Sequence, residues 1–175
     1  MNLLGDAPPW AHSLLMFLLI AAAVQDVVQR RISNWLCLAV MILAVAAAIA
    51  TGPTFALWQN ALLFAAVVVL SLPLFAAGWL GGGDVKLLAA VALWVNLATV
   101  LPLLALIFIA GGVIAVLSLA TRRKALRKSA KGVPYGVAIA VGTGILMARP
   151  TLFQPAPERT NPLDLRLAHA NALRL

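Results

Sequence analysis

The chain has 175 residues, of which 63% are hydrophobic and 10% charged, with a mean hydropathy of +1.02 and a formal net charge of +8. This composition excludes an ordinary soluble domain, so the solvent for most of the chain is lipid. The positive charge does not indicate nucleic-acid binding, because six of the cations lie in one short stretch, residues 122–131, directly after an apolar run.

The apolar runs predict an all-α, polytopic membrane protein with about six transmembrane helices. Residues 32–83 and 87–121 contain no Asp, Glu, Lys or Arg, and each run is longer than the ~20 residues that cross a bilayer once. The predicted spans are residues 10–28, 35–51, 56–77, 84–97, 102–121 and 133–148. The first lacks a positive segment before it and a convincing cleavage site, so we interpret it as a retained helix and not as a signal peptide.

The fourth predicted span, residues 84–97, is short for a membrane crossing. About 14 helical residues rise only ~21 Å, whereas the hydrocarbon core is ~30 Å thick. The span is still expected, because the chain must return to the side that it left. Residues 1–148 are therefore predicted to form one transmembrane domain, followed by a proline-rich tail, residues 149–175, that either lies on the membrane surface or is disordered.

The positions of charged and aromatic side chains predict the orientation. Nine of the thirteen cations lie in alternate connections between spans, which places connections one, three and five in the cytoplasm and both termini outside. The tryptophans lie near predicted span ends, where an indole ring prefers the headgroup level. They are Trp10, Trp35, Trp58, Trp79 and Trp94.

Cysteine and histidine give no sign of a disulfide, metal or cofactor. The single cysteine, Cys37, cannot form an internal disulfide or a cysteine-cluster zinc site, and we assign it to packing. His12 and His169 lie near opposite ends of the chain without a second ligand motif beside either. We therefore expect no metal and no cofactor.

Two aspartates stand out, because Asp26 and Asp84 are the only acidic residues between positions 7 and 157. Each has a structural explanation: Asp26 could pair with Arg30 one helical turn later, and Asp84 could cap a helix N-terminus. The predicted topology nevertheless places both at the cytoplasmic ends of their helices, where they can meet. Acidic groups at membrane depth are costly and are functional candidates. Two neighbouring carboxyl groups that share a proton supply one acid and one base.

Three glycines precede the second aspartate in "GGGD", residues 81–84. Gly81, Gly82 and Gly83 can adopt φ > 0 and present bare backbone, so an extended substrate could lie close to the carboxylates and bond to the main chain. The alternative is a flexible turn between two spans.

The motifs resemble those of a known family. "GGGD" looks like the GxGD motif of intramembrane aspartyl proteases, and the following Val-Lys, which includes Lys86, is common in prepilin peptidases. "DVVQRRISNW", residues 26–35, is similar to the first-aspartate motif of type IV prepilin peptidases, with Ser33 in place of the usual proline. "VPYGVAIAVG", residues 133–142, resembles a third block of the family. In this block Tyr135 is expected to face the site, while Gly136, Ala140 and Gly144 form a small-residue stripe for helix packing.

The resemblance implies an aspartyl endopeptidase that removes the leader peptide of a prepilin. Asp26 and Asp84 would be catalytic, and Gly81, Gly82, Gly83, Lys86 and Tyr135 would contact the substrate. One cysteine leaves no room for the paired CxxC motifs of the N-methylating members, so the chain looks like the short form of Flp-type (tight-adherence) pilus systems. The expected location is the bacterial inner membrane, with the site facing the cytoplasm. The partners are the bilayer and the precursor, and a homo-oligomer is left open.

Two other classes of function remain. The paired acids could bind a cation in a small ion- or proton-coupled transporter, although both are predicted at one membrane face. A structural subunit would use the aspartates and glycines only for caps and packing. Replacement of Asp by Asn separates these alternatives, because Asn retains capping and size but cannot act as an acid–base pair.

The predicted topology can be checked by labelling. Cysteines placed near Ser129, in the basic connection, are expected to react with an impermeant thiol reagent only from the cytoplasmic side, and cysteines near Thr54 only from outside. The reverse pattern would put both aspartates at the outer face and contradict the predicted orientation.

Overall fold

The computed structural model describes residues 1–52, 57–122 and 135–148. Helices are the regular structure in this part of the chain, and the prediction of an all-α membrane protein is confirmed. They are α1 (Leu3–Asp6), α2 (Pro9–Gln29), α3 (Asn34–Thr51), α4 (Leu57–Ala76), α5 (Gly82–Ala92), α6 (Leu97–Arg122) and α7 (Tyr135–Ala148). Four of them, α2, α3, α4 and α6, are long and apolar enough to cross a membrane, and α7 is a shorter apolar helix.

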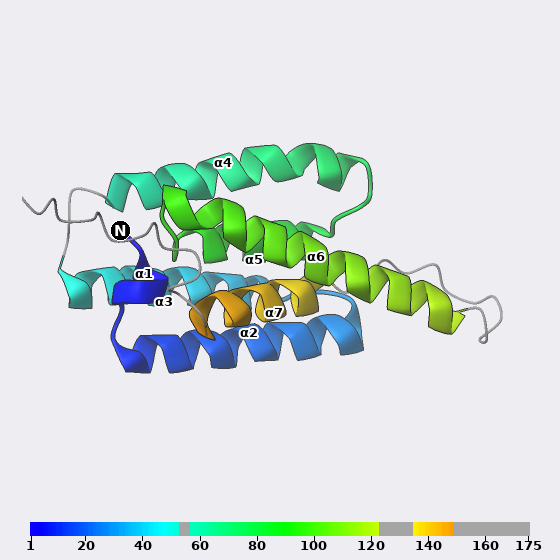
Figure 1. The fold of residues 1–175 in the computed structure, drawn as a ribbon, viewed down its shortest axis with the longest axis horizontal. Coiled ribbons are helices and arrows are strands. Elements are labelled where there is room, and N and C mark those ends of the chain that lie inside the picture. Colours follow the sequence, from blue (N-terminus) through cyan, green and yellow to red (C-terminus); the bar gives the residue numbers. More distant parts are fainter. Residues whose placement is uncertain (53–56, 123–134, 149–175) are drawn as a thin grey trace, which may run out of the picture.

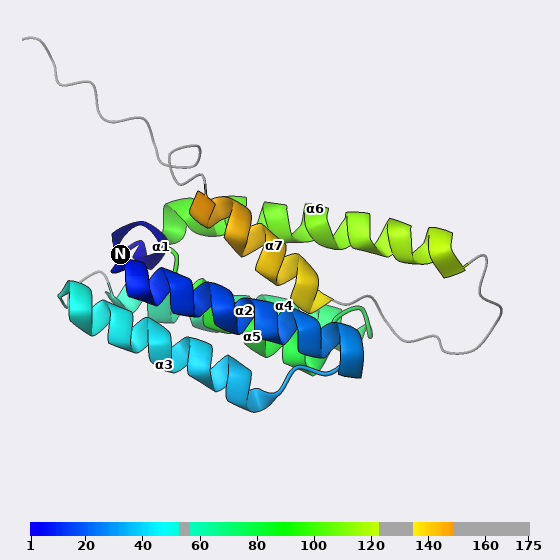
Figure 2. The ribbon, with the colours of Figure 1, turned by 90° about the horizontal axis from the view of Figure 1, so that it is seen from below.

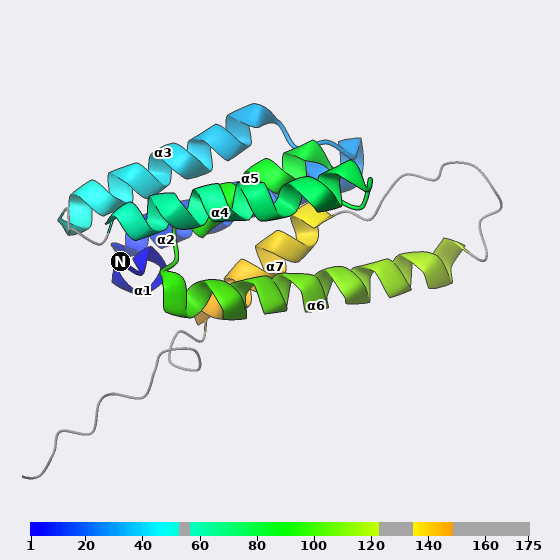
Figure 3. The same ribbon diagram turned by 90° about the horizontal axis from the view of Figure 1, so that it is seen from above.

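The helices form a bundle around the short α5 (Figures 1 and 2). Helix α5 packs against α3, α4 and α7, while α2 packs against α3 and α7. Helix α6 packs mainly on α7, and its C-terminal part extends past the other helices (Figure 3). The chain runs back and forth, so that α2 ends where α5 and α7 begin (Figure 1). This arrangement brings the two aspartate-bearing segments to the same end of the bundle.

The distribution of apolar side chains suits a lipid solvent. Many large apolar residues point outward, among them Val28, Ile49, Leu70 and Leu101. The interior is rich in small residues, including Ala11, Ala22, Ala47, Ala89 and Ala90, which are fully buried. Small residues let helices approach closely, and in lipid this van der Waals contact takes the place of the hydrophobic driving force.

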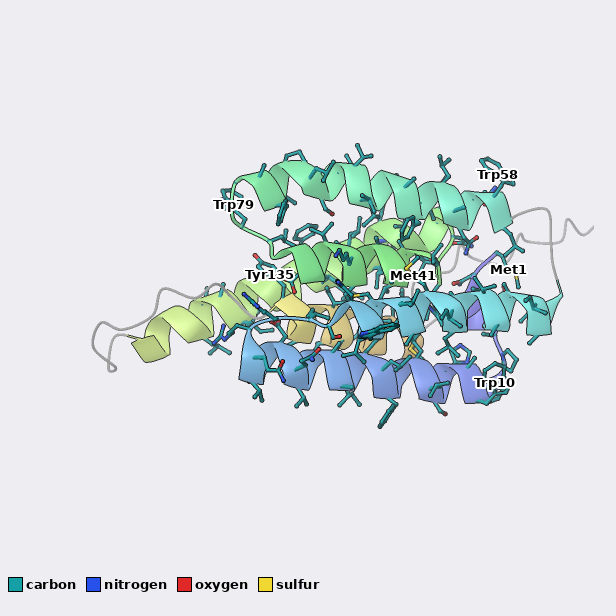
Figure 4. All side chains as sticks on the ribbon, turned by 180° about the vertical axis from the view of Figure 1, so that it is seen from behind. Met1, Trp10, Met41, Trp58, Trp79 and Tyr135 are labelled. Atoms are coloured by element: carbon teal, nitrogen blue, oxygen red, sulfur yellow. The ribbon has the colours of Figure 1, made fainter. Side chains whose placement is uncertain are left out.

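Four of the five tryptophans are exposed near helix ends, as an interfacial position requires. Figure 4 shows Trp10 and Trp58 at the same end of the bundle as Met1, and Trp79 at the end that carries Tyr135. Trp94 differs, because it is 0% exposed and its indole Nε1 donates a hydrogen bond to the Val40 carbonyl oxygen at 3.4 Å. The prediction that Trp94 lies at the headgroup level is therefore wrong.

The boundaries of the fourth and fifth predicted spans are wrong. Helix α5 covers Gly82–Ala92 instead of 84–97, and its 11 residues rise only about 16 Å. Helix α6 begins at Leu97 instead of 102, and Pro102 lies inside it. The reason is a cap that hydropathy does not reveal. Asn96 Oδ1 accepts a hydrogen bond from the Thr99 backbone N–H at 3.0 Å, and Thr99 Oγ1 accepts one from the Asn96 N–H at 3.2 Å.

Helix α1, which the sequence did not predict, covers the end of the bundle away from the aspartates. Leu3 and Leu4 are buried, and the Leu4 N–H donates to the Trp94 carbonyl at 3.0 Å. The buried Asn60 side chain donates to the carbonyls of Met1 at 3.1 Å and Leu93 at 2.7 Å. Irregular backbone at membrane depth is tolerated where protein covers it. These contacts therefore allow α5 to stop short of the bilayer thickness.

Some predictions fall outside the described residues. They concern residues 53–56, the basic connection over 123–134 and the tail over 149–175.

Candidate active site

Asp26 ends a buried stripe on α2. The buried residues of this helix, Ala11, Leu15, Leu19, Ala22 and Asp26, recur at helical spacing on one face. Asp26 is only 6% exposed. The helical period that buries the apolar side chains therefore also carries the carboxyl group into the bundle, one turn before α2 ends.

The start of α7 supplies a hydrogen bond to Asp26. The Gly136 backbone N–H donates to Asp26 Oδ2 at 2.8 Å, and this N–H belongs to the first turn of α7, where the helix dipole favours a negative charge. A Cβ on Gly136 would lie 3.0 Å from both Oδ2 and Cβ of Asp26. Residue 136 is therefore glycine because the carboxyl group touches the backbone of α7.

Asp84 occupies the third position of α5 and is 8% exposed. Its Oδ2 accepts a hydrogen bond from the Gly81 backbone N–H at 3.0 Å. Asp84 thus reaches back to the N-cap residue but is not the N-cap itself. Its Oδ1 is buried and accepts no hydrogen bond from the described residues. A buried acceptor without a partner costs about 1–3 kcal/mol, so this oxygen is a candidate for contact with a reacting molecule.

Ile32, in the turn between α2 and α3, lies between the two aspartate-bearing segments. A Cβ on Gly83 would lie 3.0 Å from Ile32 Cβ and 3.2 Å from Ile32 N and O, while one on Gly136 would lie 3.1 Å from Ile32 Cδ1. Ile32 therefore contacts the residue before Asp84 and also the residue that bonds Asp26. The contacts of Ile32 thus bring the residues beside both carboxyl groups together at one end of the bundle. Such a pair can hold one proton between two groups and act as acid and base.

The glycines before Asp84 do not adopt the predicted backbone. The glycines with positive φ in the described chain are Gly52 and Gly78, and Gly81 has a φ of −76°. The predicted φ > 0 at Gly81, Gly82 and Gly83 is therefore wrong. Steric fit explains why residue 83 is glycine, because Ile32 and Cys37 both lie close to its backbone. The buried Cys37 thiol lies 3.9 Å from the Gly83 carbonyl oxygen, which agrees with a packing role.

The predicted substrate-contacting residues lie on two sides of α5. Gly82 and Lys86 face an apolar groove of about 640 Å³ between α3, α4 and α5. Lys86 Nζ, at the polar end of this groove, donates to Asn34 Oδ1 at 2.9 Å. Asp84 lies about 200° around the helix from Gly82 and Lys86. The groove and the carboxyl groups are therefore on opposite faces of α5, and the glycine segment joins them.

In the third sequence block, Gly136 is the residue that bonds Asp26. The ring of Tyr135 packs against α6, where a Cβ on Gly111 would lie 3.0 Å from Tyr135 Cε1. Its neighbour Gly136 contacts Asp26 instead. The predicted small-residue stripe packs on α2, because a Cβ on Gly144 would lie 3.3 Å from Met16 Cε. The sequence alone did not reveal the Gly136 hydrogen bond, since the two residues are 110 positions apart.

Comparison with known proteins gives one match. The model of the type IV leader peptidase family matches residues 13–116, which include both aspartates and the helices α3, α4 and α5. No curated protein and no solved structure matched the chain.

The packing around Ile32 predicts different effects for two Gly→Ala substitutions. Gly83→Ala is expected to lower the thermal unfolding midpoint of the purified protein in detergent, because the added methyl group meets Ile32 backbone and overpacking costs about 1–3 kcal/mol. Gly112→Ala, on α6 with no atom within 4 Å of the added Cβ, is expected to leave the midpoint unchanged or raise it. Equal midpoints for the two variants would contradict close packing at Gly83.

Proposed function

The chain belongs to the type IV leader peptidase family, and on this premise we propose that it is an aspartic endopeptidase that removes the leader peptide of Flp-type prepilins. The observation that carries the proposal is the pair of buried carboxyl groups on α2 and α5 at one end of the bundle. Each is held by a backbone N–H through one oxygen. Leader peptidase activity follows from the family; the catalytic residues, substrate type and membrane face belong to the proposal.

The proposed reaction uses the two aspartates as one acid–base pair. The ionised carboxylate accepts a proton from a water molecule as the water oxygen attacks the carbonyl carbon of the scissile peptide bond. The protonated carboxyl group donates its proton to the carbonyl oxygen, which gives a neutral tetrahedral intermediate. When the C–N bond breaks, the proton taken from water passes to the leaving nitrogen. One hydroxyl group of the intermediate returns its proton to the carboxylate that had donated it, and the carbonyl re-forms. The reaction needs no metal and no cofactor.

The proposed substrate path follows the two faces of α5. The apolar segment of the precursor lies in the groove lined by α3, α4 and α5, and the extended peptide crosses the glycine segment, residues 81–83, to reach the carboxyl groups. Lys86 lies where the groove meets this segment, so it would contact the precursor near the point where it leaves the groove. Tyr135 is retained as a substrate contact in the proposal, because it begins the helix whose next residue bonds Asp26.

The proposed location is the bacterial inner membrane, with the carboxyl groups at the cytoplasmic face. The support is the positive-inside distribution: Arg30 and Arg31 directly follow α2, and Lys86 lies in the first half of α5. These cations therefore belong to the end of the bundle where α2 ends and α5 begins (Figure 1). With a single cysteine and no paired CxxC motif in the sequence, the proposal includes no methyltransferase activity.

Asp26→Asn and Asp84→Asn are each expected to lower the initial rate of precursor cleavage at least about 100-fold, because general acid–base catalysis typically contributes 10²–10⁴-fold. Asn keeps the size of Asp, and its side-chain oxygen can accept the same backbone hydrogen bond, so the fold should be kept. Rates are measured with a co-reconstituted Flp-type precursor at matched protein levels. Asp6→Asn, at the opposite end of the bundle, is the control and should cleave normally. Near wild-type cleavage by either test variant would overturn the two-aspartate mechanism.

The groove proposal predicts a position-specific effect on α4. Leu72→Trp places an indole in the groove, whereas Leu70→Trp makes the same change at an exposed apolar position that does not line it. We expect Leu72→Trp to raise KM for the precursor several-fold and Leu70→Trp to leave it unchanged. If both variants keep the wild-type KM, the groove does not bind the precursor.

A further inference from the structure

The turn between α2 and α3, residues 30–33, is held at both of its ends. Arg30 adopts a left-handed conformation, with a φ of 55°, and its N–H donates to the Asp26 carbonyl at 2.8 Å. At the other end the Ser33 N–H donates to Gln25 Oε1 at 2.8 Å. Ser33 Oγ also accepts a hydrogen bond from the Trp35 N–H at 3.3 Å and caps α3. The turn is thus tied to two adjacent residues of α2, Gln25 and Asp26.

These hydrogen bonds matter because the turn contains Ile32. Ile32 is its one buried residue, at 8% exposed, while Arg30 and Arg31 are exposed and Ser33 is partly so. Ile32 contacts Gly83 on α5 and Gly136 on α7. A displacement of the turn would therefore move the residue that separates the start of α5 from the Asp26–Gly136 contact.

The Gln25 side chain is placed to prevent that displacement. Gln25 directly precedes Asp26 and is half-buried, and its amide oxygen spans eight residues to reach Ser33. The Gln25 amide oxygen supplies an acceptor for the Ser33 N–H, so the hydrogen bond favours the observed position of the turn. The hydrogen bond links the first aspartate segment to Ile32 through one side chain.

We propose that Gln25 is a positioning residue that, through the Ser33 N–H, holds Ile32 against α5 and α7 and so sets the separation of the two aspartates. The inference rests on the proposed function, because its effect is on the geometry of the acid–base pair. Gln25 touches neither substrate nor reacting atoms in this role. Its removal changes the rate of the chemical step and leaves substrate binding in place, since the groove lies on the other face of α5.

Ser33 allows a clean removal of the hydrogen-bond donor. Its φ of −66° is the value that a proline ring imposes, so Ser33→Pro deletes the N–H with no change of φ. Ser33→Ala keeps the N–H and deletes only the hydroxyl cap. Gln25→Met removes the acceptor at similar size. Gln29→Met makes the same chemical change one turn later on α2, at an exposed residue outside the turn.

The experiment measures kcat and KM for precursor cleavage in the full-length reconstituted enzyme, normalised to folded protein. We expect Gln25→Met to lower kcat about tenfold with KM unchanged, because small misplacements of catalytic groups cost one to two orders of magnitude. Ser33→Ala and Gln29→Met should keep kcat within about twofold. Ser33→Pro installs the proline that is usual at this position in the related motif, so it should also keep kcat within about twofold. It should restore kcat in the Gln25→Met/Ser33→Pro double variant, because the ring fixes φ and leaves no N–H that needs an acceptor.

Three outcomes would overturn the inference. They are a wild-type kcat in Gln25→Met, a tenfold loss in Gln29→Met, or a double variant that is as slow as Gln25→Met. The failure of the proposed function looks different. In that case the wild-type enzyme does not cleave the precursor, or the Asp→Asn variants cleave it normally. If Ser33→Pro does not fold, the comparison of Gln25→Met with Gln29→Met still decides the question.

Discussion

The burial of two carboxyl groups is the constraint on which the rest of this structure depends. A carboxyl group at membrane depth must be satisfied within the protein. Here one oxygen of each is bonded by a backbone N–H at a helix start, from Gly136 on α7 for Asp26 and from Gly81 before α5 for Asp84. Two contacts bring α2, α5 and α7 together at one end of the bundle: the Gly136–Asp26 hydrogen bond joins α7 to α2, and the packing of Ile32 on Gly83 adds the start of α5. They also require glycine at position 136, where a side chain would displace Asp26.

The short helix α5 is the second consequence of this constraint. Asp84 can serve as an N-terminal group only if a helix begins at membrane depth, and a helix that begins there has to be surrounded by protein. All residues of α5 from Asp84 onward are buried except Lys86. At its other end α1, Asn60 and the buried Trp94 cover the irregular connection to α6. The outer helices provide the membrane crossings, and α5 positions the site.

In the proposed enzyme, the two faces of α5 have different functions. One face presents Asp84 to α2 and α7, and the other lines the apolar groove with α3 and α4. The precursor can therefore bury an apolar segment in the groove without opening the carboxyl groups to bulk water. The glycine segment before Asp84 is the passage between the two faces, and Gly81 is exposed there. The turn held by Gln25 contacts the last residue of this segment through Ile32, so it bears on the alignment of the two carboxyl groups and not on binding in the groove.

The sequence by itself determined the solvent, the helical class, the approximate spans and the identity of the two aspartates. These follow from composition, hydropathy and the rarity of acids, all of which are local properties of the chain. The alternation of cations between connections also predicted that the two aspartates lie at the same end of the bundle. Tertiary structure alone decided the burial of Trp94, the short α5, the negative φ of Gly81, and the roles of Gly136, Ile32 and Gln25. Gly136 and Ile32 act through contacts between segments distant in sequence, up to 110 residues for Gly136 and Asp26, while the Gln25 hydrogen bond depends on the path of a turn. No periodicity or motif encodes which backbone N–H faces a carboxyl group, because that is settled only when the helices pack.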